Sequence, residues 1–143
     1  MISTKGRYAV RILLDLAEHR DAGYIPMKEV VKRQGMSLKY VERILPALRD
    51  AGLISGLHGK GGGYRLTREP EQYTLFEILR CAEGDLASVA CLQENAAPCA
   101  RAAECRTLPV WKAYDALTRE YFSGIRLSDL LQPTARECSA RRE

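Results

Sequence analysis

Three cysteines in one short stretch are the side chains of this sequence best suited to chemistry. They are Cys91, Cys99 and Cys105, in the pattern C-x7-C-x5-C. Thiolates grouped in this way can hold zinc or an iron–sulfur cluster, or can act as a redox switch. Structural zinc sites usually include a C-x2-4-C pair, which this stretch lacks. The wider spacing favours a cluster, while zinc, thiol switching and no ligand at all stay open as alternatives.

Nucleophilic catalysis by these thiols is not expected. A catalytic cysteine needs a neighbouring base, and the sequence has 2 histidines, His19 and His58, both in other segments. We therefore expect a protein that is not an enzyme. Cys81 falls within an apolar helical pattern and is expected to be a small buried residue. Cys138 belongs to a polar, charged tail, 133–143, which is predicted to be disordered.

The segment 85–106, which carries the three cysteines, has little helical or strand periodicity. Loops longer than about 12–15 residues are usually functional or disordered, so a ligand is expected to hold this one. A helix is expected to follow, capped by Thr107 and stopped by Gly124. Apolar residues recur along it at helical spacing: Val110, Trp111, Tyr114, Leu117, Tyr121 and Phe122. Such a stripe predicts either a dimer seam or packing within the chain.

The stretch 25–66 predicts the fold of the N-terminal half. Pro26 starts a short helix that Gly35 ends, and Ser37 caps a second helix that Gly52 closes. The second helix should bend at Pro46, which cannot donate a backbone hydrogen bond. Two short helices joined by a tight, glycine-containing turn form a helix-turn-helix.

A basic hairpin is expected directly after this motif. Its strands are 53–55 and 64–66, joined by eight residues of which five are glycine. A flexible tip of this kind, called a wing, can lie against a phosphate backbone or enter a minor groove. A nucleotide-binding loop does not fit, because Lys60 is followed by glycines and no helix comes next. Residues 24–25 are expected to add a short third strand.

The predicted partner is double-stranded DNA. In the second helix, Arg43 suits guanine and Glu42 suits cytosine, while Ser37 and Tyr40 suit phosphate. The full set of candidate DNA-binding residues is Arg7, Lys28, Ser37, Lys39, Tyr40, Glu42, Arg43, His58, Lys60, Gly61 and Gly62. A winged helix used for protein contacts, with structural cysteines, is the alternative.

The distribution of charge agrees with this prediction. The net charge is +4, but residues 1–66 hold 12 Lys and Arg against 6 Asp and Glu, and residues 67–143 hold 10 against 12. A basic N-terminal half is typical of a nucleic-acid reader. No apolar run is long enough to cross a membrane, and the N-terminus has no signal-peptide pattern, so a cytoplasmic location is expected.

The expected fold class is mainly α with a small β-hairpin wing. A first helix, capped by Ser3 or Thr4, should run to about His19 and support the helix-turn-helix. Thr74 and Glu77 form a predicted capping box before a helix that ends near Gly84. The expected domains are a winged helix-turn-helix over 1–84, a sensor loop over 85–106, and a dimerisation helix with a short final turn over 107–132.

Taken together, these motifs resemble the Rrf family of bacterial winged-helix transcription regulators, which includes IscR and NsrR types. The resemblance covers about residues 1–132 and is carried by residues 3–10, 33–40 and 59–66 and by the three cysteines. It implies a homodimer on palindromic operator DNA. It also implies a 2Fe-2S or 4Fe-4S cluster, held by Cys91, Cys99 and Cys105, that controls DNA affinity in response to iron, redox state or nitric oxide.

The fourth ligand to that cluster is not assigned by the resemblance. The IscR type has a His three residues after the last cysteine, where this sequence has Leu108. The NsrR type uses an Asp of the partner chain near the N-terminus, and the matching residue is Tyr8. Glu94, Glu104 or a small thiol could fill the fourth position. The wing also differs, with His58 where the family often has Arg.

Overall fold

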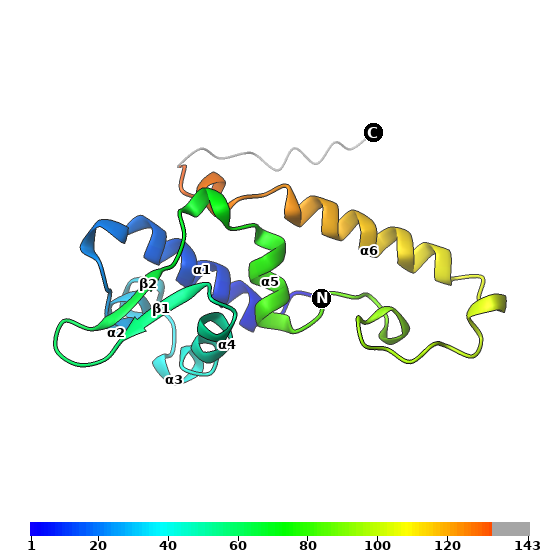
Figure 1. Cartoon of the computed structure of the whole chain (residues 1–143), viewed down its shortest axis with the longest axis horizontal. Coiled ribbons are helices and arrows are strands. Elements are labelled where there is room, and N and C mark those ends of the chain that lie inside the picture. Colours follow the sequence, from blue (N-terminus) through cyan, green and yellow to red (C-terminus); the bar gives the residue numbers. More distant parts are fainter. Residues whose placement is uncertain (133–143) are drawn as a thin grey trace.

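The computed structural model describes residues 1–132 as a mainly helical chain with one two-stranded antiparallel sheet (Figure 1). This is the predicted fold class. The expected disorder of 133–143, and Cys138 with it, lie outside the described residues. Within the described part, no helix combines the length and apolar character needed to cross a membrane.

Helix α1 (Thr4–Glu18) forms the centre of the core, as its apolar stripe predicts. Its residues Ala9, Ile12 and Leu13 are fully buried, and the helix packs against α5 (Leu75–Glu83). Ser3 caps the helix, accepting the Lys5 N–H at 3.1 Å. Arg7 and Arg11, on the opposite side of α1, are exposed. The helix therefore supports the motif with one face and meets solvent with the other.

The helix-turn-helix differs from the prediction in one respect. Helix α2 (Met27–Gln34) ends at Gly35, whose φ of 62° is left-handed, and Ser37 caps α3 (Leu38–Val41), both as predicted. A single bent helix from Ser37 to Gly52 was expected, and this is wrong: the chain turns at 42–44 and α4 (Leu45–Asp50) begins afresh. Pro46 explains the break, because it has no N–H to donate to the Glu42 carbonyl.

A buried carboxylate joins α1 to α2. Asp15 is 1% exposed and accepts hydrogen bonds from Arg33 Nη2 at 2.6 Å and from Gln34 Nε2 at 2.9 Å. Burial raises the pKa of Asp15, but the hydrogen bonds from Arg33 and Gln34 outweigh it, so the pKa lies below its usual value. The two helices are therefore held together by an ion pair with hydrogen bonds as well as by apolar packing.

The predicted wing is present. Strand β1 (Ile54–Leu57) pairs antiparallel with β2 (Gly63–Leu66). The expected third strand at 24–25 is a single bridge, in which Ile25 and Tyr64 exchange backbone hydrogen bonds of 2.8 Å. Gly63 makes this close approach possible, because a Cβ there would lie 2.3 Å from the Ile25 carbonyl.

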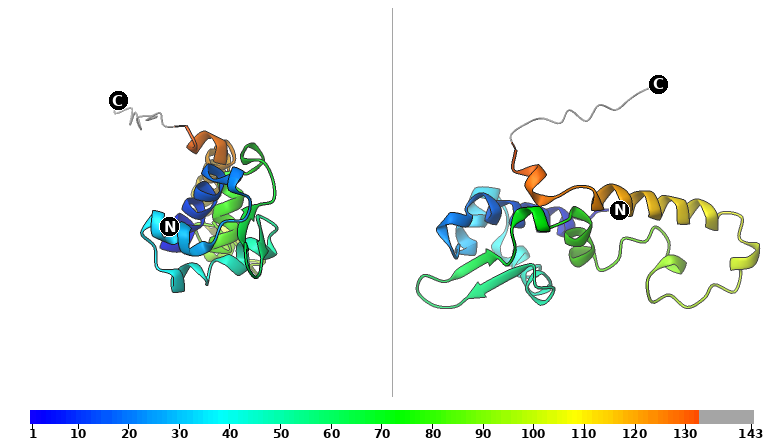
Figure 2. Two further views of the ribbon diagram at one scale, coloured as in Figure 1. Left: turned by 90° about the vertical axis from the view of Figure 1, so that its left-hand side faces the viewer. Right: turned by 45° about the horizontal axis from the view of Figure 1, so that its top comes forward.

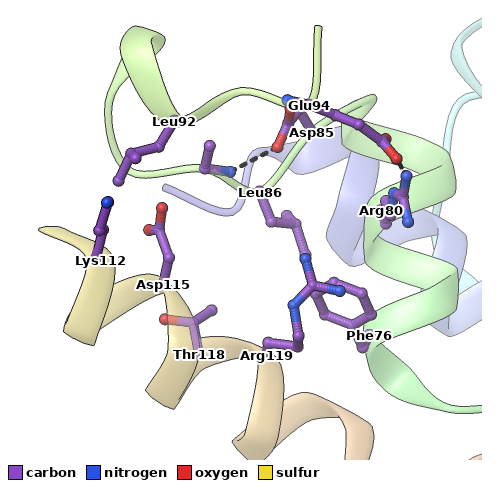
Figure 3. A pocket seen from close by; sticks show the side chains of 11 residues that line it. Phe76, Arg80, Asp85, Leu86, Leu92, Glu94, Lys112, Asp115, Thr118 and Arg119 are labelled. Carbon is purple, nitrogen blue, oxygen red and sulfur yellow. Dashed lines mark hydrogen bonds and ion pairs between the residues drawn. The ribbon is translucent and has the colours of Figure 1, made fainter. Parts of the chain in front are cut away.

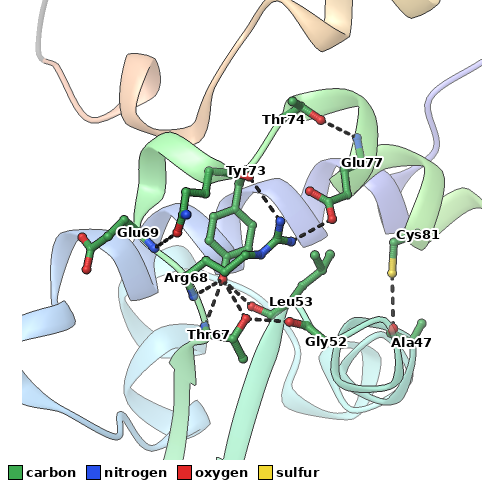
Figure 4. A network of polar contacts seen from close by, with 11 residues as sticks. Ala47, Gly52, Leu53, Thr67, Arg68, Glu69, Tyr73, Thr74, Glu77 and Cys81 are labelled. Carbon is green, nitrogen blue, oxygen red and sulfur yellow. Dashed lines mark hydrogen bonds and ion pairs between the residues drawn. The ribbon is translucent and has the colours of Figure 1, made fainter.

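Tyr73 ties the base of the wing to α5 (Figure 4). Its ring is fully buried, and its hydroxyl donates to the Leu53 carbonyl at 2.7 Å. The same oxygen accepts the backbone N–H groups of Thr67 at 3.0 Å and Arg68 at 3.1 Å. The chain entering the wing and the chain leaving it thus meet at one hydroxyl.

Helix α5 has half of the predicted capping box. Thr74 Oγ1 accepts the Glu77 N–H at 3.1 Å, as expected. The Glu77 side chain does not return to Thr74, because it pairs with Arg68 at 2.7 Å. Cys81 on this helix is half-buried, and its Sγ donates to the Ala47 carbonyl at 3.2 Å, so it is less buried than predicted.

Helix α6 (Leu108–Ser123) follows the loop 85–106 and lies apart from α1–α4 (Figure 2). Thr107 directly precedes the helix, but its side chain does not make the predicted capping hydrogen bond. Its hydroxyl instead lies 3.5 Å from Cys105 Sγ. Gly124 ends the helix as expected. The predicted short final turn is a 3₁₀ helix, Leu127–Leu130, and it buries Leu127 in the core.

Candidate functional site

The predicted DNA-contacting residues of the helix-turn-helix lie on α3 and on the turn after it. Lys39, Glu42 and Arg43 are exposed, and Glu42 and Arg43 occupy the turn rather than a continuous helix. Ser37 is also exposed; its Oγ accepts the Tyr40 N–H at 3.4 Å, which leaves the hydroxyl hydrogen free for a phosphate. Four polar or charged side chains thus face solvent over seven residues.

Tyr40 is the exception, because its ring is half-buried. It packs edge-on against Tyr8, with ring centroids 5.4 Å apart. Through this contact Tyr8 helps to position α3 against α1. Arg7 on α1 and Lys28 at the start of α2 are both exposed, so they remain candidates for phosphate contacts.

The wing tip presents His58, Lys60 and Gly61 to solvent. A turn closes it, with the Gly62 N–H donating to the Gly59 carbonyl at 3.0 Å. Gly61 has a φ of 77°, and a Cβ on Gly62 would lie 2.2 Å from the Leu57 carbonyl, so this tip requires glycine. The tip, α2 and α3 lie in the half of the molecule away from α6 (Figure 1).

The loop 85–106 brings two of the three cysteines to one hollow. Cys91 and Cys99 both line a cavity of about 570 Å³, together with Asp85 and Glu94. Both cysteines are exposed. Cys105 is half-buried at the other end of the loop and does not line this hollow. The loop thus places two thiols on one hollow and the third beside the start of α6.

Cys105 lies where a thiolate is favoured. The hydroxyl of Thr107 and the backbone N–H groups of Thr107 and Leu108 lower the pKa of its thiol. These N–H groups belong to the start of α6, where a helix terminus favours negative charge. Leu108 contributes this backbone group, and its apolar side chain adds no donor atom.

The first half of the loop is anchored to α5 and α6, which the sequence analysis did not anticipate (Figure 3). Arg80 on α5 forms an ion pair with Glu94, and Asp115 on α6 accepts the Ser88 N–H at 2.9 Å. Asp85 accepts the N–H groups of Ala87 at 2.8 Å and Glu94 at 3.0 Å. These residues surround a hollow of about 310 Å³ between the loop and the two helices. One part of this anchoring has a local sequence signal: an aspartate side chain often accepts the backbone N–H two residues later, as Asp85 does from Ala87.

Helix α6 leaves a row of apolar side chains in solvent. None of its 16 residues is buried, and Val110, Tyr114, Leu117 and Tyr121 are each more than half exposed. Trp111, at 38%, borders the same face. Exposed apolar side chains gathered on one helix in this way make this face a candidate interaction site.

This architecture of supporting helix, helix-turn-helix, basic glycine-rich wing and outlying apolar helix is that of a winged-helix regulator. A sequence model of the Rrf2 family, described as "Iron-dependent Transcriptional regulator", matches residues 2–133. The chain belongs to the Rrf2 family of transcriptional regulators.

Individual relatives agree with this assignment. The HTH-type transcriptional regulator IscR of Aliivibrio salmonicida is 32% identical over 130 residues, covering 91% of this chain and 76% of that protein. The structure of T. potens IscR is similar with a TM-score of 0.70 and 31% identity, covering 92% of this chain and 85% of that one. CymR of B. subtilis, whose structure is titled the global cysteine regulator, gives a TM-score of 0.73 and 32% identity, over 94% of this chain and 98% of that one.

These comparisons confirm the predicted family and winged-helix fold. The relatives are named as transcriptional regulators, which confirms that the chain is not an enzyme. The individual DNA-contacting and metal-binding residues stay predictions.

Proposed function

We propose that this chain is a homodimeric regulator of palindromic operator DNA whose affinity for DNA is controlled by an iron–sulfur cluster bound by Cys91, Cys99 and Cys105. One observation carries the proposal. The three thiols, two exposed and one half-buried, lie in the loop that connects the DNA-binding half to the exposed apolar helix α6. A change at the thiols therefore alters the segment that connects the DNA-binding half to α6, the proposed dimerisation helix.

In this proposal Arg43, Glu42 and Lys39 read the DNA bases. All three are exposed, on α3 and the turn that follows it. Arginine can donate two hydrogen bonds to guanine, and glutamate can accept one from cytosine. Lys60 at the wing tip and Lys28 on α2 supply the phosphate contacts, which bind every sequence equally and position the reading residues.

Dimerisation rests on α6. Its exposed row from Val110 to Tyr121 spans about three turns. Tyr114, Leu117 and Tyr121 border a hollow with Met1 and Ile2, yet each stays more than half exposed. Aromatic side chains are enriched in the centre of protein interfaces. A second copy of α6 offers the same row in return, and a two-fold dimer presents two reading heads to a palindromic operator.

The donor set fits an iron–sulfur cluster. Thiolates are the ligands such clusters use, and separated spacings suit irons at different corners. Cys91 and Cys99 already share a hollow, and the start of α6 favours Cys105 as a thiolate. A bound cluster would supply a centre that reacts with oxidants or nitric oxide. The chain's own part is to anchor the loop through Asp85 and Asp115, so that a change in the thiols reaches α5 and α6.

The coupling expected between cluster and DNA is about 1–3 kcal/mol, the usual range for linked sites. Helix α5 is the route, since it carries the Arg80 anchor and packs on both α1 and α4. Helix α4 follows directly on the turn that holds Glu42 and Arg43. A shift of α5 therefore changes the position of the reading residues.

The test is anaerobic reconstitution with iron and sulfide. Wild-type protein should become brown, and single replacements of Cys91, Cys99 or Cys105 by Ser should each abolish or strongly reduce the visible absorbance. Cys81→Ser is the matched control, because this thiol is engaged with the Ala47 carbonyl on another face, and it should leave the colour unchanged. A colourless wild-type protein, or full colour in the Cys99 variant, would overturn the cluster proposal.

A thiol switch is the second candidate, because one observation favours it. Cys105 has a lowered pKa and is accessible, which is the character of a reactive cysteine. A two-electron oxidant such as a peroxide would then join it to another thiol of the loop: the two sulfurs form a disulfide and give up two electrons and two protons, and the peroxide is reduced to water. Disulfide mapping after mild oxidation distinguishes this from a cluster, since only the switch yields a reversible bond in metal-free protein that changes DNA affinity.

A further inference from the structure

Three thiols leave an iron–sulfur cluster one ligand short. Clusters of both 2Fe-2S and 4Fe-4S type are held by four protein donors, in some cases with histidine in place of cysteine. Neither histidine is near the loop, since His19 ends α1 and His58 lies on the wing. Of the other two thiols, Cys81 is engaged with the Ala47 carbonyl, and Cys138 lies outside the described residues. The ionisable donors that remain in the loop 85–106 are the carboxylates Asp85, Glu94 and Glu104.

Glu94 is the carboxylate best placed for this role. It lies between Cys91 and Cys99 in sequence, and it lines the same hollow as both of them. Its backbone N–H is fixed by Asp85 at 3.0 Å, while its side chain is 67% exposed and can turn without disturbing the core. The main chain of Glu94 is therefore held in place, while its carboxylate is free to move.

The other carboxylates of the loop are less suitable. Asp85 lines the hollow too, but its two oxygens are occupied by the N–H groups of Ala87 and Glu94. Glu104 lies next to Cys105 and does not line the hollow that contains Cys91 and Cys99. Of these three groups, Glu94 alone is in the hollow with a carboxylate that does not hold the loop's backbone.

Glu94 also has a competing partner. Its Oε2 pairs with Arg80 of α5, and it lines the second hollow on that side as well (Figure 3). Within residues 1–132 its Oε1 makes no hydrogen bond. Glu94 thus lines both the hollow beside its cationic partner on α5 and the hollow with two thiols.

We infer that Glu94 is the fourth ligand of the metal centre and that it exchanges this position for the ion pair with Arg80 when the centre is lost. The inference rests on the proposed cluster. It adds that the loop has two anchored states: in one Glu94 faces the thiols and Arg80 is released, and in the other Glu94 holds the loop to α5. Arg80 is in this way the residue through which the state of the thiols is felt by the DNA-binding half.

The experiment compares four reconstituted proteins under anaerobic conditions: wild type, Glu94→Gln, Arg80→Gln and Glu104→Gln. Loss of the visible absorbance to an iron chelator gives the stability of the centre, and visible circular dichroism reports its ligands. We expect Glu94→Gln to lose iron at least about tenfold faster than wild type, the lower end of the effect of removing groups that support metal ligands. Its dichroism spectrum should also change.

The two other variants separate a ligand from a mere anchor. Glu104→Gln removes the same charge from the same loop and should match wild type. Arg80→Gln removes only the competing partner, so it should lose iron no faster than wild type and keep its spectrum. Because Glu94 and Arg80 are exposed, all variants are expected to fold, and far-ultraviolet dichroism checks this.

The outcomes are distinct. Faster loss and a changed spectrum in Glu94→Gln alone support the inference. Equal effects in Glu94→Gln and Arg80→Gln would mean that the ion pair only holds the loop, and would overturn the ligand assignment. A Glu94→Gln protein identical to wild type would overturn it as well, while leaving the three-cysteine proposal intact. Wild-type protein that takes up no cluster would overturn both.

Discussion

The ion pair between α1 and α2 provides a stability prediction that is independent of any ligand. In Asp15→Asn the carboxylate is replaced by a neutral group of the same shape, and Arg33 loses its closest partner, 2.6 Å away. Breaking a buried ion pair by neutralising one member costs about 3–5 kcal/mol. Arg33 is a third exposed and can turn to Glu29, now 3.6 Å away, so we expect roughly 3 kcal/mol, the lower end of that range.

The dependence on pH follows from the lowered pKa. A carboxyl group whose folded-state pKa is depressed stabilises the fold above its unfolded pKa of 3.8, and this contribution is lost as the pH falls through the folded-state pKa. The difference in unfolding free energy between wild type and Asp15→Asn should therefore be constant near neutral pH and shrink below about pH 4.

Urea denaturation followed by circular dichroism measures both effects. The matched control is Asp50→Asn, which neutralises an exposed carboxylate paired with Arg49 and should change stability by less than about 0.5 kcal/mol. A loss for Asp15→Asn as small as that of the control, or a difference that persists unchanged to pH 2.5, would refute the reasoning.

Three further predictions concern the two interfaces. Arg43→Ala should weaken operator binding by about 1–3 kcal/mol and relax specificity at one base pair; binding-site selection that returns the wild-type preference would exclude Arg43 from base reading. Lys60→Ala should weaken binding to all sequences and reduce the salt slope by about one, which titrations at several salt concentrations measure. Leu117→Glu should give monomers in sedimentation, because dimerisation would bury an unpaired charge, whereas Ala116→Glu, one residue off the apolar row, should stay dimeric. Dimeric Leu117→Glu protein would exclude this face as the seam.

The elements that depend on local chemistry could be predicted from the sequence. The caps at Ser3 and Ser37 and the left-handed end at Gly35 each depend on a few neighbouring residues, so their positions agree with the structure. The sequence predicts a bend at Pro46, whereas the structure has a break between two helices. Whether proline bends or breaks a helix depends on how the flanking residues Ile44 and Leu48 pack in the core, which periodicity does not reveal.

The contacts that link distant segments could not be predicted. Arg33 and Arg80 look like ordinary exposed residues of helix ends, and their partners Asp15 and Glu94 are 18 and 14 positions away. Thr107 shows the same limit at short range, because the hydroxyl expected to cap α6 faces Cys105 instead. A pattern of residue types indicates which face of a helix is buried, but not which polar groups meet when the faces come together.

The chain between Gly84 and Ile125 leaves the core and returns to it. The outgoing end continues from the last turn of α5, where Gly84 follows the helix. At the returning end, the Ile125 carbonyl accepts the Leu75 N–H at 2.9 Å and the Leu127 N–H donates to the Tyr73 carbonyl at 3.1 Å, so both ends of this excursion lie at α5. The entropy of closing such a loop grows only with the logarithm of its length. The cysteine loop and α6 can therefore lengthen, shorten or be exchanged for another sensing segment at little thermodynamic cost, while the winged helix keeps its own core. Amide protons of α6 should accordingly exchange by local opening in a single chain, and those of α1 only when the whole core unfolds.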